Sequence, residues 1–134
     1  MKYTLIILFV FCSVTVFSQT KSKEEQIKEA LMAVANGAKE GAKVYGYDSE
    51  GNFTVLREGT NEMICLADDP GKQGFSAASY HSSLEPFMAR GRELKAEGMG
   101  FQEIFDTRET EVKSGKLEMP DKSLLTVVTG KYDE

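Results

Sequence analysis

Residues 44–67 read VYGYDSEGNFTVLREGTNEMICLA and contain three short runs of strand-forming residues separated by turn-forming ones. The runs at 44–47 and 53–56 are rich in aromatic and β-branched residues, and the acidic, glycine-containing segment between them predicts a β-hairpin. A second turn, at 58–61, leads into the apolar run 63–67, which is typical of a buried strand. We therefore expect an antiparallel meander of three strands.

The segment before these strands predicts a helix. Ser22 and Glu25 have the spacing of a capping box, in which each side chain accepts a hydrogen bond from the backbone N–H of the other residue. Apolar residues with the spacing of one buried helix face accompany it: Ile27, Ala30, Leu31, Val34, Ala35 and Ala38. We expect the helix to end near Gly37 or Gly41, because glycine readily adopts the conformation that closes a helix.

Two further helices are expected in the second half of the chain. The first begins near Ser82, ends at Gly98 and Gly100, and buries one side. The residues of that side are Leu84, Phe87, Met88, Gly91 and Leu94. The second covers about 101–114 and ends at Gly115. Its expected inward residues are Phe101, Ile104, Phe105 and Val112.

A long loop and a last strand complete the expected fold. Residues 68–79 include Pro70 and two glycines and show no periodicity, so we expect an irregular loop, of a length often found at functional sites. Residues 123–129 predict a strand, which lies so near Glu134 that a domain continuing beyond this residue stays an open alternative. The order of elements predicts an α+β fold, with a small antiparallel sheet packed against about three helices.

The amino-terminal segment has the pattern of a cleavable signal peptide, residues 1–18. Lys2 is followed by an uncharged apolar run that ends at a site suitable for a signal peptidase, Val16 to Ser18. We therefore predict a single mature domain, 19–134, secreted or located in the periplasm. A membrane anchor is the alternative, but the run is shorter than the about 20 apolar residues that span a bilayer. A lipid-modified Cys12 would require smaller residues before it.

The predicted mature chain is acidic and contains one cysteine. Removal of the leader takes away Lys2 and no acidic residue, so the net charge falls from −5 to −6. Nucleic acid is therefore not an expected partner, because phosphate binding requires a basic surface. Cys65 has no second cysteine in the mature chain with which to form a disulfide, so stability must come from a core. No cofactor and no membrane span after cleavage are expected.

Cys65 and His81 are the residues best suited to catalysis. A thiol becomes a nucleophile when an adjacent base removes its proton, and Asp68 could orient the imidazole of such a base. The simpler interpretation is structural: Cys65 lies between Ile64 and Leu66, where a cysteine usually behaves as a small buried apolar residue. The histidine would then be a solvated neighbour of a helix start.

Three further residues are candidates for binding. Asp69, before Pro70, offers a carboxylate to a cation or an ammonium group, although this pattern is also typical of turns. Arg57 lies at a predicted strand end, where it could form a surface ion pair with Glu58. Arg108 lies near the inward face of the third helix, where a guanidinium either extends to solvent or pairs with a buried carboxylate or an anion.

The hairpin turn contains a pattern that is partly like a metal site. Asp48, Glu50 and Asn52 have the alternating oxygens found at the start of a calcium-binding loop. The residues that follow, however, have the pattern of a strand and not of a ligand loop. Since turn formation explains these three residue types, no metal site is expected.

Two segments resemble a family of secreted bacterial proteins of unknown function. They are VLREGTNEMICLADDP at 55–70 and GKLEMP at 115–120, and the resemblance covers about residues 40–129. This chain departs from the pattern before Cys65, where the family commonly has a glycine-tryptophan pair, and it contains no tryptophan. The resemblance implies an exported location and brings no established activity.

These observations favour a non-catalytic exported domain of the cell envelope or medium that binds a small molecule or another protein. The expected site is the long loop with the neighbouring strand ends, because loops on a rigid scaffold commonly carry binding residues. The alternative is a thiol-dependent hydrolase or related enzyme that uses Cys65 and His81. A surface contributed to a larger assembly is a third possibility.

Overall fold

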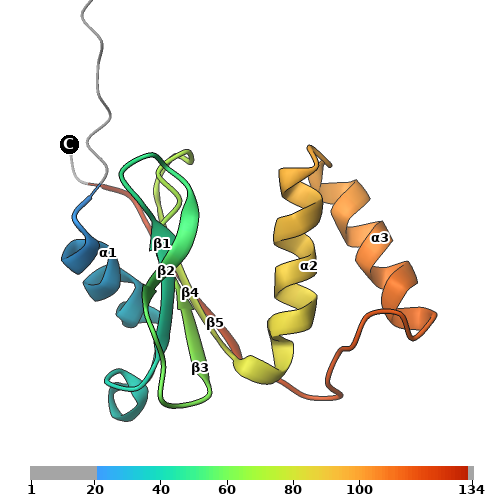
Figure 1. Ribbon diagram of the computed structural model, residues 1–134, viewed down its shortest axis with the longest axis horizontal. Helices are drawn as coiled ribbons and strands as arrows, with labels where there is room; N and C mark the ends of the chain where they lie inside the picture. Colours follow the sequence, from blue (N-terminus) through green and yellow to red (C-terminus); the bar gives the residue numbers. More distant parts are fainter. Residues whose placement is uncertain (1–20, 133–134) are drawn as a thin grey trace, which may run out of the picture.

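The computed structural model describes residues 21–132, and the predicted signal peptide lies outside this range. Its helices are α1 (Lys23–Ala30), α2 (Glu85–Ala96) and α3 (Phe101–Lys113), with short 3-10 turns at Leu31–Ala33, Asn36–Ala38 and Ser82–Leu84. Its strands are β1 (Lys43–Tyr47), β2 (Phe53–Arg57), β3 (Met63–Leu66), β4 (Phe75–His81) and β5 (Leu125–Gly130). The fold is α+β, with the sheet between α1 on one side and the α2–α3 pair on the other (Figure 1).

The five strands form one mixed sheet in the order β2-β1-β3-β4-β5. β1 and β2 form the predicted antiparallel hairpin, with Asp48 accepting hydrogen bonds from the backbone N–H groups of Glu50 and Asn52 in the turn. β3 lies on the far side of β1 and runs parallel to it, whereas β4 is antiparallel to both β3 and β5. The prediction of a fully antiparallel sheet containing a three-stranded meander is therefore wrong.

The connection between β2 and β3 explains the parallel pairing. The backbone N–H groups of Thr60 and Asn61 donate to the carbonyl oxygen of Gly41 at 2.8 and 3.0 Å. The Asn61 side chain donates to the carbonyl oxygen of Ala38 at 2.8 Å. This connection thus crosses the start of β1 and brings β3 to its other side. Gly41 permits the close approach, because a Cβ there would lie 2.8 Å from the Asn61 amide nitrogen.

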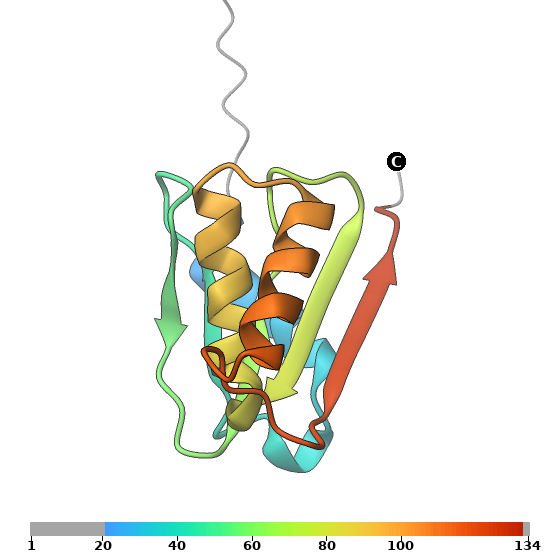
Figure 2. The ribbon, with the colours of Figure 1, turned by 90° about the vertical axis from the view of Figure 1, so that its right-hand side faces the viewer.

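Each face of the sheet has its own apolar cluster. The cluster beneath α1 contains Ala30, Val34, Ala42, Val44, Cys65 and Ala67. The cluster beneath α2 contains Ile64, Tyr80 and Leu84, with Tyr45, Leu66, Phe87 and Met88 packed against it. α3 packs on α2, and Figure 2 shows the pair lying across one face of the sheet. Both faces of the central strands are therefore buried.

α1 is shorter than predicted, although its start is confirmed. The capping box between Ser22 and Glu25 is present, with both hydrogen bonds formed. The helix ends at Ala30, and two 3-10 turns replace the predicted continuation, leaving Ala35 exposed. Gln26 is buried and fastens the helix to the sheet: its amide nitrogen donates to the carbonyl of Tyr47, and its oxygen accepts from the N–H of the same residue, both at 2.9 Å.

The predicted loop 68–79 is correct only in its first half. β4 begins at Phe75 and is an interior strand of the sheet, between β3 and β5. Ala77 and Ser79, which have weak strand propensity, are buried there, and the Ser79 hydroxyl donates to the carbonyl of Ala33 beneath α1. Small side chains allow α1 and its 3-10 turn to pack closely on this strand, and burial outweighs propensity.

The limits of α2 and α3 agree with the prediction, and so does the last strand within a residue or two. The inward face predicted for α3 is partly wrong. Phe101 is 84% exposed and Phe105 is 50% exposed, whereas Ile104 and Val112 are half-buried. The reason is that α3 packs against α2 and not flat on the sheet, so only part of its apolar face is covered.

Candidate functional site

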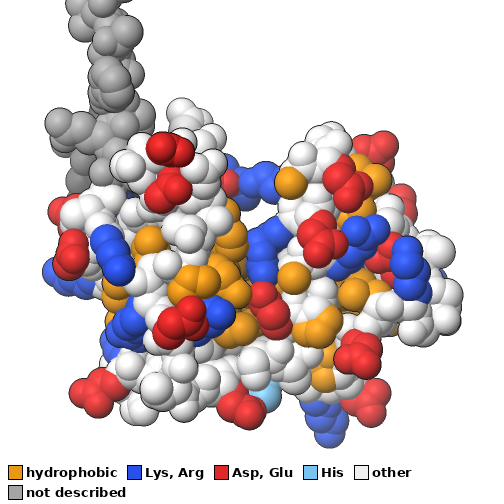
Figure 3. Space-filling view, in the orientation of Figure 1, with side chains coloured by type: hydrophobic (Ala, Val, Ile, Leu, Met, Phe, Trp, Pro, Cys, Tyr) orange, Lys and Arg blue, Asp and Glu red, His pale blue; other side chains and the backbone are white. Residues whose placement is uncertain are grey.

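A cleft of about 610 Å³ lies between the sheet and the α2–α3 pair. Its apolar lining comes from the sheet (Tyr47, Phe53, Leu66, Ala78) and from the helices (Met88, Ala96, Ile104). Its polar lining comes from the loop after β3 (Asp68, Asp69, Lys72, Gln73) and from Arg92, Lys95 and Arg108 of the helices. Figure 3 shows basic side chains in the hollow between the two halves of the molecule. This volume and mixed lining are typical of small-molecule sites.

Two basic residues of this cleft, Lys72 and Arg108, form no ion pair among the described residues; Lys72 is exposed, whereas Arg108 is half-buried. Arg108 packs on α2. Its guanidinium carbon lies 4.1 Å from the centre of the Phe87 ring, and Nη1 donates to the Phe87 carbonyl at 3.3 Å. Nε is buried without any hydrogen-bond partner in residues 21–132. Burial lowers the pKa of Arg108, but a guanidinium stays protonated in a protein, so a positive charge faces the cleft.

Gly91 of α2 makes room for this guanidinium. A Cβ at this position would lie 2.8 Å from Nη1 of Arg108, which is closer than a Cβ atom normally approaches another heavy atom. Glycine in the middle of a helix costs roughly 1 kcal/mol relative to alanine. Gly91 thus lowers the stability of α2 at the position where the Arg108 side chain packs against it.

An ion pair holds α3 against α2 and so fixes the helical wall of the cleft. Arg90 of α2 donates to both carboxylate oxygens of Glu111 of α3, Nε at 2.8 Å and Nη2 at 2.9 Å, and Lys116 adds a third contact at 3.0 Å. These hydrogen bonds hold the pKa of Glu111 down to about 2, although its side chain is only 9% exposed. A bidentate pair of this kind fixes geometry as well as charge.

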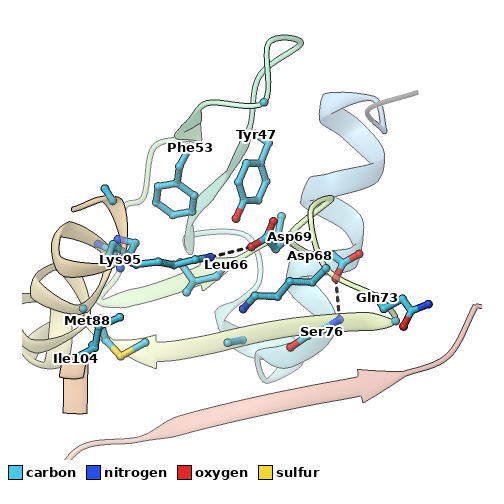
Figure 4. A pocket seen from close by; sticks show the side chains of 18 of the residues that line it. Tyr47, Phe53, Leu66, Asp68, Asp69, Gln73, Ser76, Met88, Lys95 and Ile104 are labelled. Carbon is cyan, nitrogen blue, oxygen red and sulfur yellow. Dashed lines mark hydrogen bonds and ion pairs between the residues drawn. The ribbon is translucent and has the colours of Figure 1, made fainter. Parts of the chain in front are cut away.

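Arg92 and Lys95 of the cleft are paired, unlike the exposed Lys72 of the loop. Lys95 of α2 reaches across the cleft to Asp69 at 3.1 Å (Figure 4). Arg92 pairs with Glu85 and donates to the Tyr80 hydroxyl at 3.1 Å. These contacts link the helices to the sheet and to the loop after β3, and they leave Arg108 as the charge best placed to receive an external anion.

Tyr47 and Asp68 complete the polar part of the cleft. Burial, together with the nearby charges of Asp69 and Asp68, raises the pKa of Tyr47 to about 12, so its hydroxyl keeps its proton. The Asp68 carboxylate accepts a hydrogen bond from the backbone N–H of Ser76 at 2.9 Å and another from the Tyr132 hydroxyl. Figure 4 shows the Tyr47 and Phe53 rings side by side above the cleft.

No hydrogen bond joins the predicted catalytic residues Cys65 and His81 within residues 21–132. Cys65 is fully buried beneath α1, and burial raises the pKa of its thiol to about 11. His81 contacts Glu62 through Nε2 at 2.6 Å and Ser83 through Nδ1 at 2.9 Å, so both ring nitrogens have partners other than the thiol. Asp68 bonds to Ser76, five residues from His81 along β4, which is roughly 16 Å at about 3.3 Å per residue.

The remaining predicted residues divide between structural and cleft positions. Arg57 donates to the carbonyl oxygens of Lys39 and Ala42 and thereby fixes the chain that enters β1. Glu58 pairs instead with Lys43, at 3.5 Å. Asp69 and Arg108 both line the cleft. Within residues 21–132, no group of three or more potential ligands has the arrangement of a metal site.

Gly91, Arg90 and Glu111 contribute to the site but were not identified from the sequence. Gly91 was assigned only to a helix face, and its position in the middle of a helix was the available signal. The charged pair gives no signal, because its members are distant in sequence and each resembles an ordinary surface residue.

Comparison of the chain with protein-family models, with curated proteins and with solved structures finds no match. Among the helices in the described part of the chain, none combines the length and the apolar character needed to cross a membrane.

Proposed function

We propose that this protein is an exported, non-catalytic binding domain whose cleft receives a small organic molecule with an acidic group and an apolar part. The observation that carries the proposal is the Arg108 guanidinium, which lines the cleft with its Nε buried and unbonded. A buried hydrogen-bond donor without a partner costs about 1–3 kcal/mol, and an anion that accepted its hydrogen bond would offset this cost. The export depends on the predicted signal peptide.

The lining of the cleft supports the nature of the ligand. Carboxylates and phosphates match the fork of hydrogen-bond donors in a guanidinium, which favours them over neutral acceptors. The helices contribute Met88 and Ile104 to the lining of the same cleft, and the sheet contributes Leu66 and Ala78. An apolar group of the ligand would displace water from these side chains. The proposed ligand therefore binds by its acidic end at α3 and by its apolar part along the sheet.

The test uses probes that differ in charge and not in shape. We expect 4-phenylbutyrate to bind and its amide and amine analogues to bind much more weakly, as measured by amide chemical-shift changes in NMR spectra. Arg108→Met keeps the apolar stem and removes the charge, and we expect it to weaken 4-phenylbutyrate binding about tenfold, equivalent to about 1.4 kcal/mol.

Lys113→Met is the matched control, because it also removes one positive charge from α3. Lys113 is 71% exposed and pairs with Glu109 on the outer side of the helix. Binding should be unchanged in this variant. Equal binding of the acid, amide and amine, or equal losses in the two variants, would contradict the proposed role of Arg108.

The thiol-enzyme alternative receives no support from a specific contact. A buried thiol with a raised pKa is a poor nucleophile, since the thiolate is the reactive form. No hydrogen bond joins Cys65 to His81 within residues 21–132. The observations therefore favour binding over catalysis.

A further inference from the structure

The outer edge of β5 is the most exposed apolar surface of the sheet. β5 is the last strand of the sheet, and Figure 2 shows it beyond the area that α2 and α3 cover. Leu125 is 50% exposed and Val127 is 54% exposed. No charged residue lies between Lys122 and Lys131. Edge strands of stable monomers usually carry charges, proline or a bulge that prevent pairing with another strand, and β5 has none of these.

The opposite edge of the sheet is protected in this way. β2 is paired to β1 through an irregular register between Val44 and Tyr45, and it ends in Arg57 followed by Glu58. A bulge and charged residues both disfavour pairing with a further strand. The contrast between the two edges therefore indicates that β5 is the edge able to pair with another strand.

The hydrogen bonds between β4 and β5 show which backbone groups are available. The N–H of His81 donates to the carbonyl of Leu124 at 3.2 Å. Backbone groups alternate in direction along an antiparallel strand, so residues 124, 126, 128 and 130 face β4. The N–H and C=O groups of Leu125, Val127 and Thr129 consequently face outward.

We infer that two copies of this chain pair through their β5 edges, antiparallel and about a two-fold axis at Thr126. This register sets Leu125 opposite Val127 of the second copy, with both residues in hydrogen-bonding positions. On the sheet face that carries α2, it brings together two leucine and two valine side chains. On the other face it sets Leu124 opposite Val128 of the second copy. The two sheets become one continuous ten-stranded sheet.

Charge complementarity selects this register over its neighbours. Asp121 lies before β5 and Lys131 directly after it; with the axis at Thr126, the end of the paired strands that carries Asp121 of one copy also carries Lys131 of the other, and this arrangement occurs twice. Both residues are exposed, and neither forms an ion pair with the rest of the described chain. An axis at Val127 would instead set Leu125 opposite Thr129, and an axis at Leu125 would set Val127 opposite Ser123. Each of these registers sets an apolar residue opposite a hydroxyl residue and moves Asp121 away from Lys131 of the second copy.

Cysteine cross-linking tests both the pairing and the register. Thr126 lies on the axis and is opposite Thr126 of the second copy. The two residues form a non-hydrogen-bonded pair with Cα atoms about 4.5 Å apart, a separation that a disulfide spans. The full chain, expressed with its leader so that any processing occurs, should therefore cross-link rapidly in the Thr126→Cys variant. Thr129→Cys is the matched control and should remain uncross-linked, and the buried Cys65 does not interfere.

Sedimentation equilibrium from about 1 to about 200 µM gives an independent measure. We expect a monomer–dimer equilibrium, weakened about tenfold by Asp121→Lys and restored by combining Asp121→Lys with Lys131→Asp. A monomer over the whole range overturns the inference. A dimer dissociation constant that is unaffected by these charge changes also overturns it, as does equal cross-linking of the two cysteine variants. Val127→Lys should abolish the dimer while leaving the thermal unfolding midpoint of the monomer nearly unchanged.

Discussion

Replacing Gly91 by alanine separates the stability of α2 from the position of Arg108. Alanine in the middle of a helix is favoured over glycine by about 1 kcal/mol. The added methyl group, however, would lie 2.8 Å from Nη1 of Arg108. Because the guanidinium is the far end of a flexible side chain, we expect it to move away from the Phe87 ring. The backbone of α2 should stay in place.

The magnitude follows from the contacts that Arg108 loses. Its position over the Phe87 ring, 4.1 Å from the centre, contributes about 0.5–1 kcal/mol at a partly exposed site. This loss offsets most of the gain in helix propensity, so Gly91→Ala alone should change the free energy of unfolding by less than about 0.5 kcal/mol. In an Arg108→Ala background nothing opposes the methyl group, and the same substitution should stabilise the protein by about 1 kcal/mol.

Urea denaturation of the four proteins of this double-mutant cycle measures the coupling, and NMR titration with 4-phenylbutyrate measures binding. We expect Gly91→Ala to bind the acid about tenfold more weakly than the unmodified chain although its stability is almost the same. The reasoning is refuted if Gly91→Ala destabilises the protein by more than about 1 kcal/mol, since α2 itself would then be displaced. It is equally refuted if binding is unaffected.

Three further predictions concern the scaffold and the thiol. Gln26→Met should destabilise the protein by about 2 kcal/mol in urea denaturation, because it leaves the N–H and C=O of Tyr47 without partners; a loss below about 0.5 kcal/mol would contradict this role. The low pKa of Glu111, about 2, predicts stability that is complete above about pH 4.5 and declines as the pH falls toward 2. Glu111→Gln should remove this part of the pH dependence of the urea midpoint, and an unchanged profile would show that the pair with Arg90 is not the cause. Cys65 should resist iodoacetamide at about pH 8 and react once urea unfolds the chain; fast labelling of the native protein would revive the thiol hypothesis.

Local features of the fold could be predicted because neighbouring residues encode them. The capping box at Ser22, the hairpin around Asp48 and the limits of α2 and α3 depend on residues within a few positions of one another. The parallel pairing of β1 with β3 depends on hydrogen bonds between Gly41 and the later segment around Thr60. Such a contact leaves no periodic pattern, so the sequence alone favoured the simpler meander.

The candidate site was predictable to a similar extent. The position of Arg108 on the third helix identified it as a possible anion-binding residue, and Asp69 was correctly placed in a loop next to the site. The cleft itself depends on how α3 packs against α2, and the ion pair between Arg90 and Glu111 helps to fix this packing. The exposure of Phe105 has the same origin, because a helix that packs only on its neighbour leaves part of its apolar face uncovered.

The account depends on an acidic ligand group meeting the guanidinium of Arg108 inside the cleft. The most direct measurement is the ¹⁵N-detected signal of the Arg108 Nε–H group during titration with 4-phenylbutyrate. The account predicts a saturable downfield proton shift and slower exchange with water, because a carboxylate would accept the hydrogen bond that Nε lacks. A signal that stays unchanged while amide groups elsewhere report binding would contradict it.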